Sequence, residues 1–462
     1  MKRLIAAFSA LALAGCNGAT DSNDWEPKSF VELENPDWSR DAVVYQVNTR
    51  QFSEEGTFAA VQKELPRLKE LGVDILWLMP IHPIGEVNRK GTLGSPYSVK
   101  DYFNVNPEFG TKEEFKAFVD AAHDQGFKVI LDLVANHTAW DHPLANEHPD
   151  WYEKTWDGDF RPTPWWDWSD IIDLDWTKPG VRQHIGEAME YWVREFDVDG
   201  YRADVAGYVP VDFWETMRGR LSAIRPVFML GEVQETAFHR ASFDATYAWD
   251  WHHTSKDVAK GAANPTAFYG YYAENESLWP REAMRMTYIE NHDSNSWEGT
   301  LRENYAAGLE AATALAFTGE GIPLVYNGME ACNDKRLEFF EKDAINWSKL
   351  GHDEACAYGQ LIEELIAFRK ANPALENGQW GARMRKVETD SSESVFAWVR
   401  EEEGNKVLGL FNFTAAPVEV TFADGLPAGN YTEFRSGNVT FVSGDTVTIP
   451  ASGFRLFSQL VP

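Results

Sequence analysis

The sequence predicts an α/β protein built on a closed (β/α)8 TIM barrel. From about residue 41, eight short and largely apolar segments alternate with amphipathic helices, as expected for parallel strands that are covered on both faces. No glycine-rich phosphate loop follows the first segment, which argues against an open nucleotide-binding sheet. From about residue 383 the pattern changes to short alternating strands with turn residues, which predicts a C-terminal antiparallel β-sandwich domain.

The barrel strands are predicted where short apolar runs end at turn residues or polar clusters. The helices between them carry apolar residues at helical spacing, and the clearest begins with Thr111 as N-cap and Glu114 at the capping-box position. Strands are expected at 42–48, 75–79, 128–134, 200–205, 227–230, 243–249, 284–289 and 322–326. Helices are expected at 58–71, 111–125, 179–196, 211–224, 255–263, 305–317 and 360–371, and C-terminal strands at 394–399, 407–413, 418–422 and 446–449.

One segment, 138–175, breaks the alternation because it is rich in Trp, Asp and Pro and has no clear periodicity. An insertion after the third strand lies at the face of a barrel where sites are built, so we expect a short inserted lobe there (domain B). The barrel is therefore assigned to 35–137 and 176–378, and the C-terminal β-sandwich (domain C) to 379–462.

The start of the chain predicts export. A short basic stretch precedes an apolar run, 4–13, that is too short to span a bilayer. The Leu-Ala-Gly-Cys that follows resembles a bacterial lipobox, which implies a signal peptide over 1–16, lipidation of Cys16 and a polar tether over 17–34. Asn17 favours the outer membrane, so we expect a cell-envelope lipoprotein held at the membrane by its lipid anchor. A plain secretory signal with an incidental cysteine is the alternative.

The composition narrows the class of partner. A formal net charge of −30 repels nucleic acid and anionic substrates but suits a neutral substrate. The 19 Trp, 16 Tyr and 28 Phe fill the core, and any excess suits a cleft that binds the flat faces of sugar rings. We expect a monomer. Cys332 and Cys356 either form a disulfide or remain two free thiols.

Polar and acidic residues follow four of the barrel strands. The carboxyl ends of barrel strands meet at one face, so these residues are expected to share a site. Arg202 and Asp204 lie two residues apart and project from the same face of a strand, where the guanidinium would keep the carboxylate ionised. An ordinary buried ion pair is the alternative. The other candidates are Asp132, Asn136 and His137 after the third strand, Glu232 after the fifth, and Glu290, His292 and Asp293 after the seventh.

These strand ends carry ordered motifs that resemble those of the α-amylase family of glycoside hydrolases. The resemblance implies retaining hydrolysis of α-glucosidic bonds in starch-derived glucans or malto-oligosaccharides. An α-glucan transglycosylase with the same site and a non-catalytic glucan-binding lipoprotein are the alternatives. The motifs are DLVANH at 132–137, GYRADVA at 200–206, GEV at 231–233 and ENHD at 290–293, with supporting matches at 95–111, 171–176 and 323–330.

The resemblance also implies catalytic roles. Asp204 matches the nucleophile, Glu232 the general acid/base and Asp293 the third carboxylate. Retention of configuration predicts that the first two carboxyl groups lie about 5–5.5 Å apart. Arg202 would hold Asp204 charged, and Asp132 would support Arg202.

Sugar-binding roles follow from the same resemblance. His137 and His292 would donate hydrogen bonds to sugar hydroxyls, and Tyr97 would stack on the reacting sugar. Trp297 just past the fourth motif is a candidate stacking platform, with local packing as the alternative. The same two interpretations apply to Trp165, Trp166 and Trp168 on the lobe.

Two features concern specificity and metal binding. Gly207 and Tyr208 stand where the amylase-type motif usually continues with Lys-His on the leaving-group side. Asn136 and Asp173 match positions that bind Ca²⁺ in many family members, so structural calcium is an expected cofactor. Hydrogen bonding of Asn136 to the lobe without metal is the alternative, and no organic cofactor is expected.

Overall fold

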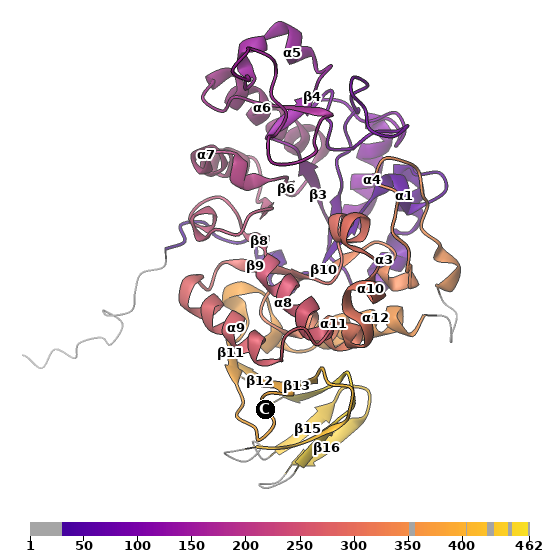
Figure 1. Ribbon diagram of the computed structural model, residues 1–462, viewed down its shortest axis with the longest axis vertical. Helices are drawn as coiled ribbons and strands as arrows, with labels where there is room; N and C mark the ends of the chain where they lie inside the picture. Colours follow the sequence, from indigo (N-terminus) through magenta and orange to yellow (C-terminus); the bar gives the residue numbers. More distant parts are fainter. Residues whose placement is uncertain (1–29, 351–355, 403, 423–428, 442–445, 461–462) are drawn as a thin grey trace, which may run out of the picture. The chain divides into compact units, whose positions relative to one another are not determined.

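Eight parallel strands close into a barrel in the computed structural model, which describes residues 30–462 except 351–355, 403, 423–428, 442–445 and 461–462 (Figure 1). Neighbouring strands follow the order β1-β10-β9-β8-β7-β6-β3-β2, so the last strand pairs with the first. All eight predicted strands are present, and the predicted barrel is confirmed. They are β1 (Val44–Val47), β2 (Ile75–Leu78), β3 (Lys128–Leu133), β6 (Gly200–Ala203), β7 (Phe228–Gly231), β8 (Ala245–Tyr247), β9 (Met284–Tyr288) and β10 (Ile322–Tyr326).

The N-terminal predictions lie mostly outside the described residues. This is so for the signal peptide, for Cys16 and for most of the tether. The last residues assigned to the tether lie against the barrel. Glu32 N–H donates to the Arg240 carbonyl (2.6 Å), and Arg218 Nη2 donates to the Glu34 carbonyl (3.1 Å). Within the part of the chain that the structure describes, we find no helix with the length and apolar character needed to cross a membrane.

Most helices lie where the sequence predicts them. These are α4 (Lys112–Asp124), α6 (Pro179–Phe196), α7 (Val211–Ser222) and α12 (Ala357–Lys370). The predicted capping box starts α4, because Glu114 N–H donates to Thr111 Oγ1 (3.1 Å) and Thr111 N–H to Glu114 Oε2 (2.8 Å).

The expected helix 58–71 was wrong as a single element. It is divided at Glu64 into α2 (Phe58–Lys63) and α3 (Leu65–Leu71). Pro66 causes the break because it has no N–H to donate to the preceding turn, and its ring clashes with a continuous helix.

Two further helix predictions need correction. The expected helix 305–317 is mainly α11 (Leu309–Thr318), and a separate short helix with a second capping box, α10 (Leu301–Tyr305), precedes it. The expected helix 255–263 is only the last part of α8 (Trp249–Ala259), and the next helix, α9 (Thr266–Leu278), was not predicted. Aromatic residues of α9 pack against both the barrel helices and the C-terminal domain, which obscures the one-sided periodicity of a surface helix.

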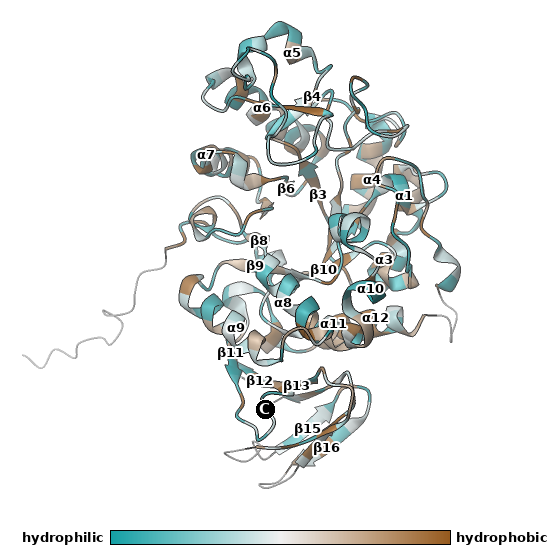
Figure 2. Cartoon of the chain, viewed as in Figure 1, coloured by the Kyte–Doolittle hydropathy of each residue, from teal (hydrophilic) through white to brown (hydrophobic). Residues whose placement is uncertain are grey.

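Large apolar side chains fill the inside of the barrel. In Figure 2, strand β10 is largely brown, whereas the helices around the barrel carry teal segments. Gly200 starts β6 with φ 143°, and a Cβ there would lie 1.9 Å from the Phe228 carbonyl oxygen, so the close approach of β6 and β7 requires glycine. The interior cluster includes Val44, Ile75, Trp77, Ile130, Phe228, Leu230, Tyr247, Met286, Tyr288 and Leu324.

A small lobe follows β3, as expected. Strands β4 (His137–Ala139) and β5 (Ile171–Asp173) pair antiparallel, and the short helix α5 (Pro143–Glu147) lies between them in the sequence. The Leu174 N–H donates to the Asn136 carbonyl (2.9 Å), which ties the end of the lobe to the strand end that starts it.

The C-terminal domain contains two antiparallel sheets, which confirms the predicted all-β domain. Four of its strands were predicted, whereas β11, β15, β16 and β18 were not, because polar and exposed residues weaken the alternation in most of them. Tyr269 of α9 packs on Phe396 (ring centroids 4.8 Å apart) and accepts a hydrogen bond from Ala397 N–H (2.9 Å), so the domain packs on the barrel (Figure 1). The sheets are β11-β12-β13-β18-β15-β16 and β14-β17, with β11 (Met384–Lys386), β12 (Val395–Glu402), β13 (Asn405–Asn412), β14 (Val418–Thr421), β15 (Gly429–Glu433), β16 (Gly437–Phe441), β17 (Thr446–Ile449) and β18 (Gly453–Leu460).

The two cysteines left open by the sequence form a disulfide. The Cys332–Cys356 bond has an S–S distance of 2.08 Å. It links the turn after β10 to the residue that starts α12.

Candidate active site

The polar strand ends meet at the carboxyl face of the barrel, as the sequence predicts. Asp204 N–H donates to the Leu133 carbonyl (2.9 Å) and Glu232 N–H to the Ala203 carbonyl (3.0 Å), which continues the parallel ladder just past the strand ends. These backbone bonds fix where the two carboxylates leave the sheet. The site is therefore positioned by rigid strands rather than by free loops.

Arg202 is the centre of the site. Its side chain is completely buried, with Nη1 2.8 Å from Asp132 Oδ1 and 2.9 Å from Asp204 Oδ1. Nη2 lies 2.9 Å from Glu232 Oε2, and Nε donates to the Tyr247 hydroxyl (3.2 Å). One guanidinium thus holds three carboxylates, which goes beyond the ordinary ion pair considered from the sequence.

Burial and the charge of Arg202 act in opposite directions on the pKa values of the three carboxyl groups. Burial raises the pKa of Asp204 and of Glu232, and the Arg202 guanidinium opposes the rise in both. Burial also raises the pKa of Asp132 to about 6, again against the effect of Arg202. Three buried carboxyl groups around one positive charge repel one another, so each ionisation makes the next one less favourable.

Val205 joins the two central carboxylates through its backbone. It adopts a left-handed conformation (φ 35°, ψ 48°), which costs a β-branched residue about 1–3 kcal/mol. This conformation directs its N–H to Glu232 Oε2 at 2.7 Å. Strain next to Asp204 is thus coupled to the position of Glu232.

A hydrogen-bonded chain runs across the floor of the site. Gln46 Nε2 donates to His292 Nδ1 (2.7 Å), which leaves the imidazole proton on Nε2 to donate to the Tyr97 hydroxyl (2.7 Å). Tyr97 then donates to Asp132 Oδ2 (3.0 Å), which also accepts from Trp77 Nε1 (3.0 Å). Burial lowers the pKa of His292 to about 3, which keeps the ring neutral for this pattern.

Gln46 and Trp77 were not predicted as site residues from the sequence. Gln46 is fully buried in the otherwise apolar strand β1, and a polar side chain in a buried strand could have signalled a role in the site. Trp77 gave no such signal, because an indole in a barrel strand looks like core.

The other predicted sugar-binding residues lie around this floor. His137 is buried, with Nδ1 3.2 Å from Asn136 Nδ2 and its ring 5.9 Å from Trp168, and burial lowers its pKa to about 4. Asp293 lies 3.4 Å from His292 Nε2, and its side chain is 44% exposed. A cavity of about 390 Å³ opens beside Asp293.

Aromatic side chains form the rim. Trp297 is 55% exposed and packs on Phe339, whose ring is also offset-parallel to Tyr97 at 6.1 Å. Phe339 comes from a loop after β10 for which the sequence gave no signal. On the lobe, Trp166 stacks on Trp168 at 5.9 Å. Among the described residues, the exposed Trp165 makes no ring contact with these two side chains.

Tyr208 gives the unusual second motif a structural meaning. Trp166 Nε1 donates to the Tyr208 hydroxyl at 3.3 Å, so the lobe contacts the loop after β6 directly. Both rings remain about half exposed. Tyr208, which with Gly207 replaces the Lys-His expected from the resemblance, is therefore paired with an aromatic residue of the lobe.

The two residues expected at a calcium site are in contact, but their surroundings do not fit the ion. Asn136 Nδ2 donates to Asp173 Oδ1 (3.2 Å), which also accepts from the Thr163 hydroxyl (2.5 Å). The Arg161 guanidinium lies 3.9 Å from Asp173 Oδ2. Calcium requires six to eight oxygen ligands, whereas two donors and a cation already satisfy this carboxylate. The described residues hold no group of three His, Cys, Asp or Glu side chains suited to a metal.

The fold and the site define a class of protein. A (β/α)8 barrel with two carboxyl groups held by one arginine at the strand ends is the arrangement of a glycoside hydrolase. Family models agree, since residues 26–402 match "Alpha amylase, catalytic domain" and 387–460 match "Alpha amylase, C-terminal all-beta domain". The chain belongs to the α-amylase family.

Individual relatives support this assignment. The chain is 31% identical over 436 residues to Alpha-amylase MalA from Haloarcula japonica, covering 90% of this chain but only 61% of that relative's length. The solved structure of a noncanonic maltogenic alpha-amylase, AmyB, from Thermotoga neapolitana has a TM-score of 0.82 at 28% identity, covering 91% of this chain and 99% of that one. An alpha-amylase from Lactobacillus plantarum has a TM-score of 0.80 at 32% identity, covering 92% and 100%.

Proposed function

We propose that this protein is a retaining hydrolase of α-glucosidic bonds in starch-derived glucans or malto-oligosaccharides. The observation that carries the proposal is Arg202, which holds Asp204 at 2.9 Å and Glu232 at 2.9 Å on one side chain. The substrate class is supported by the similar proteins, which are named as alpha-amylases and as a maltogenic alpha-amylase.

Each carboxyl group has a separate task in this mechanism. Asp204 attacks the anomeric carbon while the Glu232 proton moves to the departing glycosidic oxygen, so a sugar–carboxylate bond forms as the glycosidic bond breaks. Glu232, now ionised, takes a proton from water, and the resulting hydroxide oxygen displaces Asp204. Two displacements retain the configuration at the anomeric carbon. Asp293, which projects into the cleft, stabilises the positive charge that develops on the sugar.

Neutral histidines fit the binding of sugar hydroxyls. Burial keeps His137 and His292 neutral, so neither brings a charge into the site, and a bound sugar hydroxyl would compete with Tyr97 for the His292 Nε2–H. Tyr97 is positioned by His292 and Asp132 to contact the reacting sugar, and Trp297 offers an exposed ring at the rim.

The Trp166–Tyr208 pair favours a second outcome, transfer to another sugar. Two half-exposed rings joined at 3.3 Å form an apolar surface that would hold an acceptor sugar in place of water. Products longer than the substrate from pure maltotriose would reveal this transglycosylation. Strict hydrolysis would give only shorter products.

The hydrolase proposal is tested with a reducing-sugar assay on soluble starch, maltodextrins and cyclodextrins. Asp204→Asn should reduce kcat by about 10⁴-fold or more because it removes the nucleophile. The proposal fails if the wild type acts on no α-glucan, or if Asp204→Asn retains the wild-type rate. Glucan binding without turnover would favour the non-catalytic alternative.

We also propose that Cys16 carries a lipid anchor that holds the protein at the cell envelope. We propose the outer membrane as its place, because the residue after the cysteine is Asn17. The lipobox-like Leu-Ala-Gly-Cys supports this. In a Gram-negative host, labelled palmitate should enter the wild type but not Cys16→Ser. Incorporation into both proteins, or into neither, contradicts the proposal.

A further inference from the structure

Residues 85–94, part of the loop after β2, connect two other parts of the barrel mouth. In the closed barrel β2 stands between β3, which the lobe follows, and β1, which adjoins β10. The loop after β2 therefore lies between the lobe and the loop after β10. We call residues 85–94 the bridge loop, because they contact both of these neighbours.

Lys90 fixes the bridge loop to the lobe. Its ammonium group donates to the Asp167 carbonyl and lies 3.8 Å from Asp170 Oδ1. Nearby, the Glu86 N–H donates to Asp141 Oδ2 (3.1 Å), which adds a second contact with the lobe. The Lys90 side chain is only 21% exposed, so most of its length is covered by these neighbours.

The other side of the bridge loop packs on the loop after β10. The Leu93 N–H donates to the Phe340 carbonyl (3.1 Å), and the Thr92 N–H donates to Glu341 Oε1 (2.7 Å). Gly91 has φ 62°, and a Cβ there would lie 2.6 Å from Phe340 Cβ, so the two loops leave no room for a side chain between them. The Lys90 ammonium also lies 5.9 Å from the Phe340 ring centroid. Lobe, Lys90 and Phe340 thus form one continuous wall.

Both ends of this wall reach residues expected to bind the reacting sugar. Phe340 packs on Phe339 (ring centroids 5.2 Å apart), which lies 6.1 Å from the Tyr97 ring. At the other end, Trp168 follows the lobe residue that Lys90 contacts, and its ring lies 5.9 Å from that of His137. The wall therefore stands beside the candidate site.

The barrel order gives the side of the site on which the wall stands. β6 and β10 are four strands apart in an eight-stranded barrel, so they face each other across the mouth. Tyr208, in the loop after β6, occupies a position that the resemblance places on the leaving-group side. The wall lies on the opposite side, where the glucan chain would continue from the reacting sugar toward its non-reducing end.

We propose that the bridge loop closes the cleft on this side, with Lys90 as a specificity-determining residue, so that the enzyme cleaves α-glucans from the non-reducing end and releases short saccharides. The reaction itself rests on the proposed function, and the wall adds the end-directed cleavage. A longer chain on this side would collide with Lys90 and Phe340, which excludes internal segments of a glucan.

The test compares two forms of nitrophenyl maltoheptaoside, one with a free non-reducing end and one whose terminal sugar carries an ethylidene acetal. Cleavage by full-length wild-type protein is followed by chromatography of the products. We expect the acetal to lower kcat/KM by about 100-fold or more, because the blocked sugar does not fit against the wall. Equal kcat/KM values for the two substrates would overturn the proposal.

Lys90→Ala tests the residue assigned to the wall. It removes the side chain that contacts both the lobe and Phe340, so the ratio of kcat/KM for the blocked substrate to that for the free one should rise about tenfold or more. This ratio does not depend on the amount of folded enzyme, so a general loss of stability would not move it. A ratio that stays at the wild-type value would overturn the role of Lys90.

Lys100→Ala is the matched control. Lys100 also joins the loop after β2 to the lobe, and its ion pairs among the described residues are with Glu86 (3.2 Å) and Asp141 (3.0 Å). Its removal weakens the same junction without removing Lys90, so the ratio should stay as in the wild type. An equal rise in both lysine variants would overturn the proposal.

The two proposals fail in different ways. If the wild type cleaves neither maltoheptaoside nor any other α-glucan, the proposed function fails, and the end-directed cleavage fails with it. If the wild type cleaves the free and the blocked substrates equally well, only the closed end of the cleft is wrong and the hydrolase remains.

Discussion

Two buried arginines, Arg202 on β6 and Arg285 on β9, meet the same cost of burial in opposite ways. Burial alone would lower the pKa of Arg202, but Asp132 and Glu232 raise it well above its ordinary value. Burial lowers the pKa of Arg285, which has no carboxylate within ion-pairing distance among the described residues. Tyr247 contacts both, through its hydroxyl to Arg202 and its carbonyl to Arg285.

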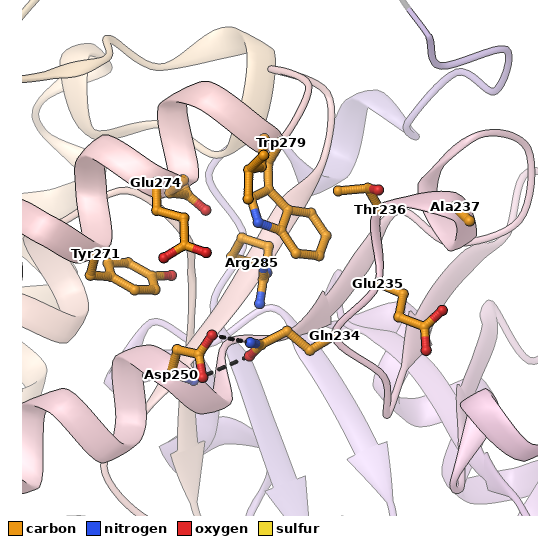
Figure 3. A pocket seen from close by; sticks show the side chains of 11 residues that line it. Gln234, Glu235, Thr236, Ala237, Asp250, Tyr271, Glu274, Trp279 and Arg285 are labelled. Atoms are coloured by element: carbon orange, nitrogen blue, oxygen red, sulfur yellow. Dashed lines mark hydrogen bonds between the residues drawn. The ribbon is translucent and has the colours of Figure 1, made fainter.

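The difference shows how surroundings decide what a buried cation does. Arg202 points into the barrel mouth, where its charge orders the carboxylates that take part in the proposed reaction. Arg285 points outward from the sheet, where an aromatic ring and a carbonyl hold it and one donor remains unused. A guanidinium paired with carboxylates organises its neighbours, whereas the unpaired one is held by a ring face (Figure 3) and a carbonyl alone.

The largest expected effect comes from breaking the geometry of Arg202 while keeping its charge. Arg202→Lys should lower kcat/KM on maltodextrin by about 10³-fold, since a single ammonium cannot reach Asp132, Asp204 and Glu232 together. Steady-state kinetics measure this. A loss of less than about tenfold would mean that charge alone is sufficient.

The matched control is Arg218→Lys. Arg218 also forms a buried two-point pair, with Asp244 (2.5 and 3.0 Å), but it lies on α7, away from the strand ends. It should lower the melting temperature and leave kcat of the folded enzyme within about threefold. A comparable loss of kcat in both variants would remove the contrast between the two arginines.

A smaller effect is expected from relaxing the strained link between Asp204 and Glu232. Val205→Gly should keep or raise stability, because glycine adopts the left-handed conformation freely, but lower kcat about tenfold. A looser N–H bond to Glu232 lets the pKa of that carboxyl rise, so the basic limb of the pH–rate profile should move to higher pH.

Val205→Ala is the control for this prediction, because it keeps a Cβ and therefore keeps the strain. Its kcat should stay within about threefold of the wild type. Unchanged kcat in Val205→Gly would show that the strained conformation is unnecessary for the reaction.

The third prediction concerns a buried carboxyl group that lacks an arginine, the reverse of Arg285. Burial raises the pKa of Glu290 from 4.5 to about 8, and among the described residues only Asn295 Nδ2 donates to this carboxyl group (3.0 Å). Between these pH values the folded protein keeps a proton that the unfolded chain has lost. Stability should therefore fall as pH rises through this window, by up to about 1.4 kcal/mol per pH unit.

Glu290→Gln should remove this pH dependence, because the amide imitates the neutral acid. Denaturant unfolding from pH 5 to pH 9 measures it, with the variant becoming more stable than wild type at the alkaline end. The exposed Glu363→Gln makes the same change of charge and should leave the slope as it is. Parallel curves for wild type and Glu290→Gln would contradict the prediction.

The smallest expected effect is from metal removal. Because Asp173 is already satisfied by Asn136, Thr163 and Arg161, excess EDTA should change the melting temperature by less than about 1 °C. Thermal unfolding with and without EDTA, and with added Ca²⁺, decides this. A larger drop that Ca²⁺ restores would reinstate the calcium site expected from the resemblance.

Much of the fold was predictable because its signals are local. Apolar runs marked all eight barrel strands, and the capping box at Thr111 marked the start of α4. The same reasoning failed where local and distant demands conflict. Pro66 divided a helix that periodicity made continuous, and α9 was missed because its aromatic residues contact both a barrel helix and the C-terminal domain, which weakens the expected pattern of a surface helix.

The candidate site, like the fold, was predictable only in part. The carboxylates were found because chemistry and spacing coincide at the strand ends. Gln46, Phe339 and the Trp166–Tyr208 contact were not, because each acts with a partner far away in the sequence.

The sequence by itself determined the barrel, the order of its motifs and the identity of Asp204, Glu232 and Asp293 as the candidate carboxylates. The barrel depends on periods of two and 3.6 residues, which a linear chain records, and the carboxylates were identified by the resemblance of their motifs to those of the family. Only the tertiary structure decided that Arg202 holds three carboxylates while Arg285 holds none, since the chain does not state which strand faces meet which neighbours. Burial and pairing are properties of that packing, and they set the different tasks of two residues of the same type.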